Sequence, residues 1–112
     1  MHQLIFSSQC KQVLNRMTQE QQMQLIDCLG RFDFNLSNNY GKILRDTKCY
    51  FRLRWQEFRV YFEKTDEHTF TIHYLLPKHT WNDFLFRTKL PFNEEEVERD
   101  NRFWQYLESL KK

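Results

Sequence analysis

The chain has 112 residues and a formal net charge of +2 at pH 7, and it contains only two glycines and two prolines. This length fits one domain, and this composition excludes a low-complexity or collagen-like chain. The chain has neither the ~20-residue apolar run needed to cross a bilayer nor a signal-peptide pattern. Its three cysteines are widely spaced and no cluster of metal ligands is visible. We expect one cytoplasmic domain over residues 1–112, with no membrane contact, metal or other cofactor.

The first third of the chain predicts a strand followed by a helical hairpin. Met1–Phe6 is a short apolar start, and Ser7 or Ser8 can cap the helix that follows. Thr18 and Gln21 form a capping box that starts a second helix. The apolar positions recur at helical spacing in both helices: Cys10, Val13, Leu14 and Met17, then Leu25, Cys28, Leu29 and Phe32.

The middle of the chain changes from no periodicity to a period of two. Leu36–Lys48 carries no clear pattern and is predicted to be a loop. Cys49–Trp55 and Phe58–Glu63 alternate apolar with polar residues, which predicts a hairpin turning at Gln56-Glu57. Thr69–Leu76 is a more apolar and central strand that Pro77 ends.

The last third predicts two helices. Thr80 with Asp83 can cap a short helix over Trp81–Arg87, and Asn93 with Glu96 starts a final helix. We expect this final segment, residues 93–112, to be an acidic extension that packs on the core through Trp104 and Leu107. Shielding of a basic face and a role in a dimer are the alternatives. The fold class is therefore α+β: an N-terminal strand, a helical hairpin, one twisted sheet of antiparallel strands with helices on one face, and C-terminal helices.

The predicted hairpin concentrates positive charge. Residues 42–64 contain seven basic and three acidic side chains. If the apolar residues of the hairpin face the helices, Arg52, Arg54, Arg59 and Tyr61 share the opposite face. Arginines collected there repel one another, and a phosphate held by their planar guanidinium groups would offset that repulsion. The alternative is a solvated face on which the arginines pair with Glu57 and Glu63.

The amino-acid sequence of this region resembles that of the RelE/ParE toxin superfamily. Gly41-Lys-Ile-Leu-Arg is followed by Cys49-Tyr-Phe-Arg-Leu-Arg-Trp-Gln-Glu-Phe-Arg-Val-Tyr-Phe-Glu, and the resemblance spans roughly residues 1–90. It implies a toxin that a cognate antitoxin neutralises, as a homodimer or a toxin–antitoxin hetero-oligomer. In the nuclease branch, the toxin acts on the ribosome, where the 2′-OH of the mRNA attacks the adjacent phosphate.

The resemblance also implies roles for individual residues. Arg59 matches the family's phosphate-binding arginine, Arg52 and Arg54 match basic positions on the preceding strand, and Lys78-His79 matches a basic segment that carries a catalytic arginine or histidine. We therefore assign catalysis to Arg54, Arg59 and His79. We assign substrate binding to Arg52, Tyr61, His73, Lys78 and Trp81.

Two departures from the family pattern leave alternatives open. Arginine stays protonated and is a poor general base, so His79, His73 or Glu57 would have to accept the proton. Phe84-Leu85-Phe86 stands where the family often has a functional tyrosine. A non-nucleolytic toxin that acts on a protein such as DNA gyrase, or a non-toxic RNA-binding module, therefore competes with the nuclease hypothesis. His73 as a half-buried strand residue, His79 as an exposed loop residue and Trp81 as core packing are the corresponding structural interpretations.

Overall fold

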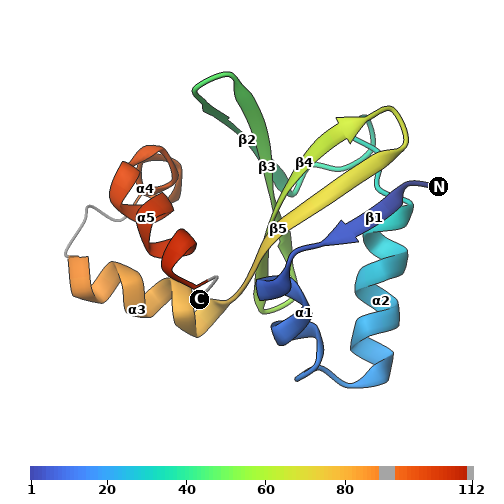
Figure 1. Cartoon of the computed structure of the whole chain (residues 1–112), viewed down its shortest axis with the longest axis horizontal. Helices are drawn as coiled ribbons and strands as arrows, with labels where there is room; N and C mark the ends of the chain where they lie inside the picture. The colour runs from blue at the N-terminus through green and yellow to red at the C-terminus, as the bar shows by residue number, and fades with distance from the viewer. Residues whose placement is uncertain (89–92, 111–112) are drawn as a thin grey trace.

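The computed structural model describes residues 1–88 and 93–110, and within them it confirms the predicted α+β class (Figure 1). The strands form one sheet in the order β1-β5-β4-β3-β2. The elements are β1 (Gln3–Phe6), α1 (Ser8–Leu14), α2 (Gln19–Gly30), β2 (Tyr40–Arg45), β3 (Lys48–Trp55), β4 (Phe58–Asp66), β5 (Thr69–Pro77), α3 (Lys78–Thr88), α4 (Glu94–Arg99) and α5 (Asn101–Ser109). No helix among these residues is both long and apolar enough to cross a membrane.

The sheet is a meander of four antiparallel strands with one parallel edge. Strands β2 to β5 follow one another in sequence and in space, and β1 pairs with β5 in parallel, with Gln3 opposite Thr69. Strand β5 thus lies inside the sheet, as its apolar composition predicts. The two edges belong to β1 and β2.

Helices cover both faces of the sheet (Figure 1). Helices α1 and α2 pack on one face, as predicted for the helical hairpin, and α3, α4 and α5 pack on the other. The first core contains Cys10, Met17, Leu25, Leu29, Phe32, Leu53, Trp55, Val60, Phe62, Phe70, Ile72 and Leu75. The second core contains Ile43, Tyr61, Tyr74, Leu76, Trp81, Phe84, Val97, Phe103, Trp104 and Leu107. The C-terminal segment therefore packs on the domain through Trp104 and Leu107, as predicted, and it does so on the second face.

A bulge in β5 changes which of its residues face each core. Tyr61 pairs with Tyr74 and Phe62 pairs with Ile72, so His73 is an extra residue between the two pairs. The extra residue shifts the side-chain alternation by one position. As a result Ile72 and Leu75 both enter the first core, although strict alternation would place them on opposite faces.

Local sequence signals set most helix starts. The Ser7 hydroxyl accepts from the N–H of Cys10, and Thr18 and Gln21 form the predicted capping box. The side chain of Asn93 accepts from the N–H groups of Glu95 and Glu96, which starts α4 as predicted. These caps satisfy backbone donors that have no partner inside the helix.

The prediction of a loop over Leu36–Lys48 is wrong for its second half. Tyr40–Arg45 forms the edge strand β2, which pairs with β3 from Tyr40 opposite Leu53 to Arg45 opposite Lys48. The buried side chain of Ile43 anchors the strand in the second core. Its stability comes from pairing and packing with distant residues, so the local sequence carries little sign of it.

The predicted helices after Pro77 also differ from the observed ones. Helix α3 begins at Lys78, directly after β5, so Thr80 lies inside the helix and does not cap it. The single helix predicted after Asn93 is two helices that meet at Asp100. Asp100 has extended backbone angles and its side chain accepts from the N–H of Arg102, which ends α4 and starts α5.

Removal of the Phe62 side chain should destabilise the whole fold. Phe62 is fully buried and its ring contacts those of Phe51 and Phe70. Phe62→Ala should lower the free energy of unfolding by about 3–5 kcal/mol, because it leaves a cavity in the first core. Phe86→Ala is the matched control, because Phe86 is exposed, and it should change stability by less than about 0.5 kcal/mol. Urea denaturation measures both, and equal effects would contradict the assigned core.

Candidate functional site

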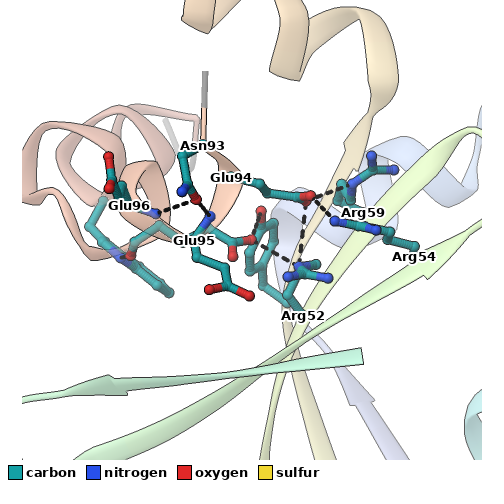
Figure 2. Close-up of polar contacts among 10 residues, drawn as sticks. Arg52, Arg54, Arg59, Asn93, Glu94, Glu95 and Glu96 are labelled. Carbon is teal, nitrogen blue, oxygen red and sulfur yellow. Dashed lines mark hydrogen bonds and ion pairs between the residues drawn. The ribbon is translucent and has the colours of Figure 1, made fainter. Parts of the chain in front are cut away.

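Helix α4 covers the arginine face of the hairpin. Figure 2 shows Glu94 pointing from the start of α4 toward Arg52, Arg54 and Arg59 on β3 and β4. Arg54 and Arg59 pair directly across the two strands, and Arg52 lies two residues before Arg54 in β3. The alternation predicted from the sequence therefore does place the three arginines on one face.

Glu94 is bound by all three arginines. The Nε atom of Arg59 donates to Oε1 of Glu94 at 2.9 Å, and Nε of Arg52 lies 3.4 Å from the same oxygen. Arg54 donates to the second oxygen, Oε2. Burial by itself would raise the pKa of Glu94, but the charge of Arg52 and the hydrogen bonds from Arg54 and Arg59 hold that pKa below its ordinary value. Glu94 is therefore a carboxylate anion at neutral pH.

Glu98 lies deeper, one helical turn along α4. Its side chain is 1% exposed, and its Oε2 accepts from Nε of Arg52 at 3.2 Å and from the hydroxyl of Tyr61 at 2.8 Å. Burial raises the pKa of Glu98, although Arg52 and the Tyr61 hydroxyl favour its charged form. Burial and the neighbouring Glu98 likewise raise the pKa of Tyr61 well above its ordinary value, so that hydroxyl is a donor.

Gly41 makes room for the guanidinium group of Arg52. A Cβ atom at position 41 would lie 2.6 Å from Nη2 of Arg52, closer than any ordinary contact. Gly41 and Arg52 face each other across β2 and β3. This glycine, which belongs to the motif behind the superfamily resemblance, thus has a packing role in this structure.

The expectation that Arg52 and Tyr61 lie on an open face is wrong for this structure. Arg52 is 5% exposed and Tyr61 is fully buried. The ring of Tyr61 packs 5.7 Å from that of Phe103 in α5. The acids that pair with the three arginines are Glu94 and Glu98, and within the described residues none of these arginines forms an ion pair with Glu57 or Glu63. The spacing of four between Glu94 and Glu98 is the sequence signal for this pairing, since it places both on one helix face.

His73 contacts Glu63 and Tyr50, and Trp81 packs in the second core, so neither residue belongs to the arginine cluster. The Nε2 atom of His73 is 3.1 Å from Oε1 of Glu63, and its ring contacts Tyr50, so it is a half-buried strand residue away from Arg54 and Arg59. Trp81 is buried in the second core, with its ring 5.0 Å from that of Phe103. The Trp81 ring is therefore closed to stacking on an RNA base, and the His73 ring is only partly exposed.

A groove at the end of the β3–β4 hairpin holds the remaining candidates. Its volume is about 780 Å³, and it lies between the end of α1, the β3–β4 turn and the start of α3. The backbone N–H of Lys78 donates to the carbonyl oxygen of Glu57 at 2.7 Å, which joins the turn to α3. The residues lining the groove include the exposed side chains of Arg16, Glu57, Lys78 and His79, over an apolar floor of Val13, Met17, Phe58, Leu76 and Pro77.

The structure therefore divides the predicted site into two parts. Lys78, His79 and Glu57 share the groove, whereas Arg54 and Arg59 bind Glu94 and do not line the groove. Arg16 also lines the groove; it lies in the predicted helical hairpin, where no local pattern marks it as a site residue. Among residues 1–88 and 93–110, no group of three His, Cys, Asp or Glu side chains is arranged to hold a metal ion.

Comparison of the chain with protein-family models, curated proteins and solved structures gives no match. Membership of the RelE/ParE superfamily therefore stays a prediction from the sequence.

Loss of the Glu98 carboxylate should destabilise the folded protein strongly. Glu98→Ala should lower the free energy of unfolding by about 3–5 kcal/mol, because it leaves the buried Arg52 without its deepest partner. The matched control is Glu95→Ala on the same helix, since the Glu95 side chain is exposed. It should change stability by less than about 0.5 kcal/mol. Chemical denaturation compares the two, and similar losses would contradict the buried pair.

The ion pairs of Glu94 predict a specific dependence of stability on pH. Because the pKa of Glu94 is lower in the folded chain than its ordinary value of 4.5, its contribution is complete above pH 4.5 and is lost as the pH falls through the lowered value. Glu94→Gln should therefore weaken the loss of stability on acidification. Denaturant titrations of both proteins at pH 7, 4.5 and 3 test this. A constant difference in stability across the three pH values would show that Glu94 does not titrate as described.

Proposed function

We propose that this protein is a RelE-like, metal-independent endoribonuclease that cleaves mRNA with residues of the groove. The observation that supports the proposal is the gathering of His79, Glu57, Lys78 and Arg16 in one cavity. These side chains provide two groups that can exchange protons and two cations. An apolar floor that includes Phe58 and Pro77 lies beneath them and suits an unpaired base.

The chemistry requires no cofactor. A base removes the proton of the RNA 2′-OH, whose oxygen attacks the adjacent phosphorus, and an acid protonates the 5′ oxygen that leaves. His79 and Glu57 are the candidates for this acid–base pair. Lys78 and Arg16 would stabilise the negative charge that develops on the phosphate. This assignment keeps His79 and Lys78 in the roles that the family resemblance implies, and it selects His79 and Glu57 from the three proton acceptors that the sequence offers.

The partners proposed here follow from the same resemblance. They are a cognate antitoxin, the ribosome and its mRNA, in the cytoplasm, with a homodimer or a toxin–antitoxin hetero-oligomer as the assembly. Arg54 is the member of the arginine cluster that is most open to such partners, because about half of its side chain (51%) is exposed.

A second candidate is a non-nucleolytic protein on the same fold, either a toxin directed at DNA gyrase or a non-toxic RNA-binding module. The covered arginine face favours it. Glu94 and Glu98 neutralise the residues that match the family's phosphate-binding positions, and Tyr61 is buried beneath α4 and α5.

The loss of His79 tests the proposed nuclease. With purified ribosomes and mRNA, His79→Ala should slow cleavage by about 100-fold or more, the range typical of a lost acid or base. His68→Ala is the matched control, because His68 is an exposed histidine in the turn between β4 and β5, and it should cleave at the normal rate. Absence of cleavage by the unaltered protein would overturn the proposal. Induced expression with mapping of transcript ends extends the test to cells, where cuts within codons are expected, and harmless overexpression would favour the binding module.

A further inference from the structure

The arginine cluster has an outer and an inner half that differ in access to solvent. In the outer half, the side chains of Arg54, Arg59 and Glu94 are 51%, 16% and 15% exposed. In the inner half, the side chains of Arg52 and Glu98 are 6% and 1% exposed. A solute can therefore approach Glu94 past Arg54, whereas Glu98 is almost fully buried and borders a small pocket of about 120 Å³ that Gly41 and Arg52 also line.

The environment of Glu94 suits a phosphate oxygen as well as a carboxylate. Guanidinium groups from three positions approach its two oxygens, two of them at Oε1 and one at Oε2. Arginine binds carboxylates and phosphates with the same planar arrangement of N–H donors. The Glu94 carboxylate thus occupies an oxyanion site that the sheet provides.

Departure of Glu94 would not leave the buried charge of Arg52 unpaired. Arg52 keeps its hydrogen bond to Glu98, which also accepts from Tyr61. Arg54 and Arg59 lie close enough to solvent to be hydrated or to take another anion. The covering helices also stay anchored, because Phe103, Trp104 and Leu107 of α5 remain buried in the second core. Exchange at the outer half therefore requires only movement of the Glu94 side chain.

We propose that Glu94 is an exchangeable internal ligand that closes an oxyanion site formed by Arg54 and Arg59, and that an external phosphate group opens the site by taking its place. Glu98 is the fixed anchor that holds α4 on the sheet during the exchange. The chemical class of ligand is a phosphate oxyanion, either free or in the backbone of single-stranded RNA. The choice of RNA as a ligand rests on the proposed function, whereas the exchange itself does not.

Binding to matched variants tests the exchange. Glu94→Gln keeps the size of the side chain and removes its charge, and Glu95→Gln makes the same change at an exposed position of the same helix. Titration with inorganic phosphate and with a short single-stranded RNA, followed by calorimetry, gives the affinities. Glu94→Gln should bind the phosphate group roughly tenfold or more tightly than the unaltered protein, since the competing occupant is gone. Glu95→Gln should not. Addition of Arg59→Ala to Glu94→Gln should remove the gain.

The same titration of the unaltered protein does not depend on the folding of any variant. Followed by NMR of the arginine Nε–H groups, phosphate should shift the signals of Arg54 and Arg59 more than that of Arg52, whose Nε–H donates to Glu98. Response to inorganic phosphate identifies free phosphate as sufficient, and response to RNA alone identifies the polynucleotide backbone. Equal affinities of Glu94→Gln and Glu95→Gln, or equal shifts at all three arginines, would overturn the proposal. Since these readouts are binding and not cleavage, they are unaffected if His79→Ala shows the groove to be inactive.

Discussion

The buried charge of Arg52 is the constraint on which the packing of α4 against the sheet depends. A guanidinium group removed from water is strongly destabilising unless charged and hydrogen-bonded partners surround it. Glu98 and Glu94 provide the charge, and the Tyr61 hydroxyl completes the hydrogen bonding of Glu98. The absence of a side chain at Gly41 leaves the space that Arg52 occupies. Two carboxylates of α4, a glycine of β2 and the hydroxyl of Tyr61 thus together accommodate one buried arginine.

This network of ion pairs belongs to a sheet face that is buried by helices and is not open to solvent. A sheet with helices on one side only would leave the arginines and Tyr61 in water, ready for an external anion. Here α3, α4 and α5 bury that face with aromatic and aliphatic side chains, and the arginines form part of the interface. A buried ion pair contributes little net stability compared with apolar packing, but loss of one partner is costly. The pairs thus fix where α4 lies, while the aromatic residues of α5 supply most of the stabilisation.

Local signals in the sequence predicted the elements well and their long-range partners poorly. The period of two over Cys49–Glu63 and the capping box at Thr18 are local, and the structure confirms both. The edge strand β2 was missed, because its pairing with β3 and the burial of Ile43 in the second core come from residues outside the segment. The sequence likewise indicated that Arg52, Arg54 and Arg59 share a face, but not that Glu94 and Glu98, about 40 residues away, would cover it. Alternation along a strand determines which face of the sheet a side chain points to, whereas the residues that cover that face depend on the tertiary fold.

The separation of the two candidate sites has a consequence for how RNA would bind. Phe58 and Arg59 are consecutive residues of β4, so their side chains point to opposite faces of the sheet. Phe58 lies on the floor of the groove beside the proposed acid–base pair, and Arg59 binds Glu94 in the cluster. Arg59 does not line the groove, although Leu76, its partner in β5, does. If RNA is cleaved in the groove, the arginines that bind Glu94 are therefore better placed to hold a neighbouring phosphate than the phosphate that is cleaved, in contrast to the single shared site that the family resemblance implies.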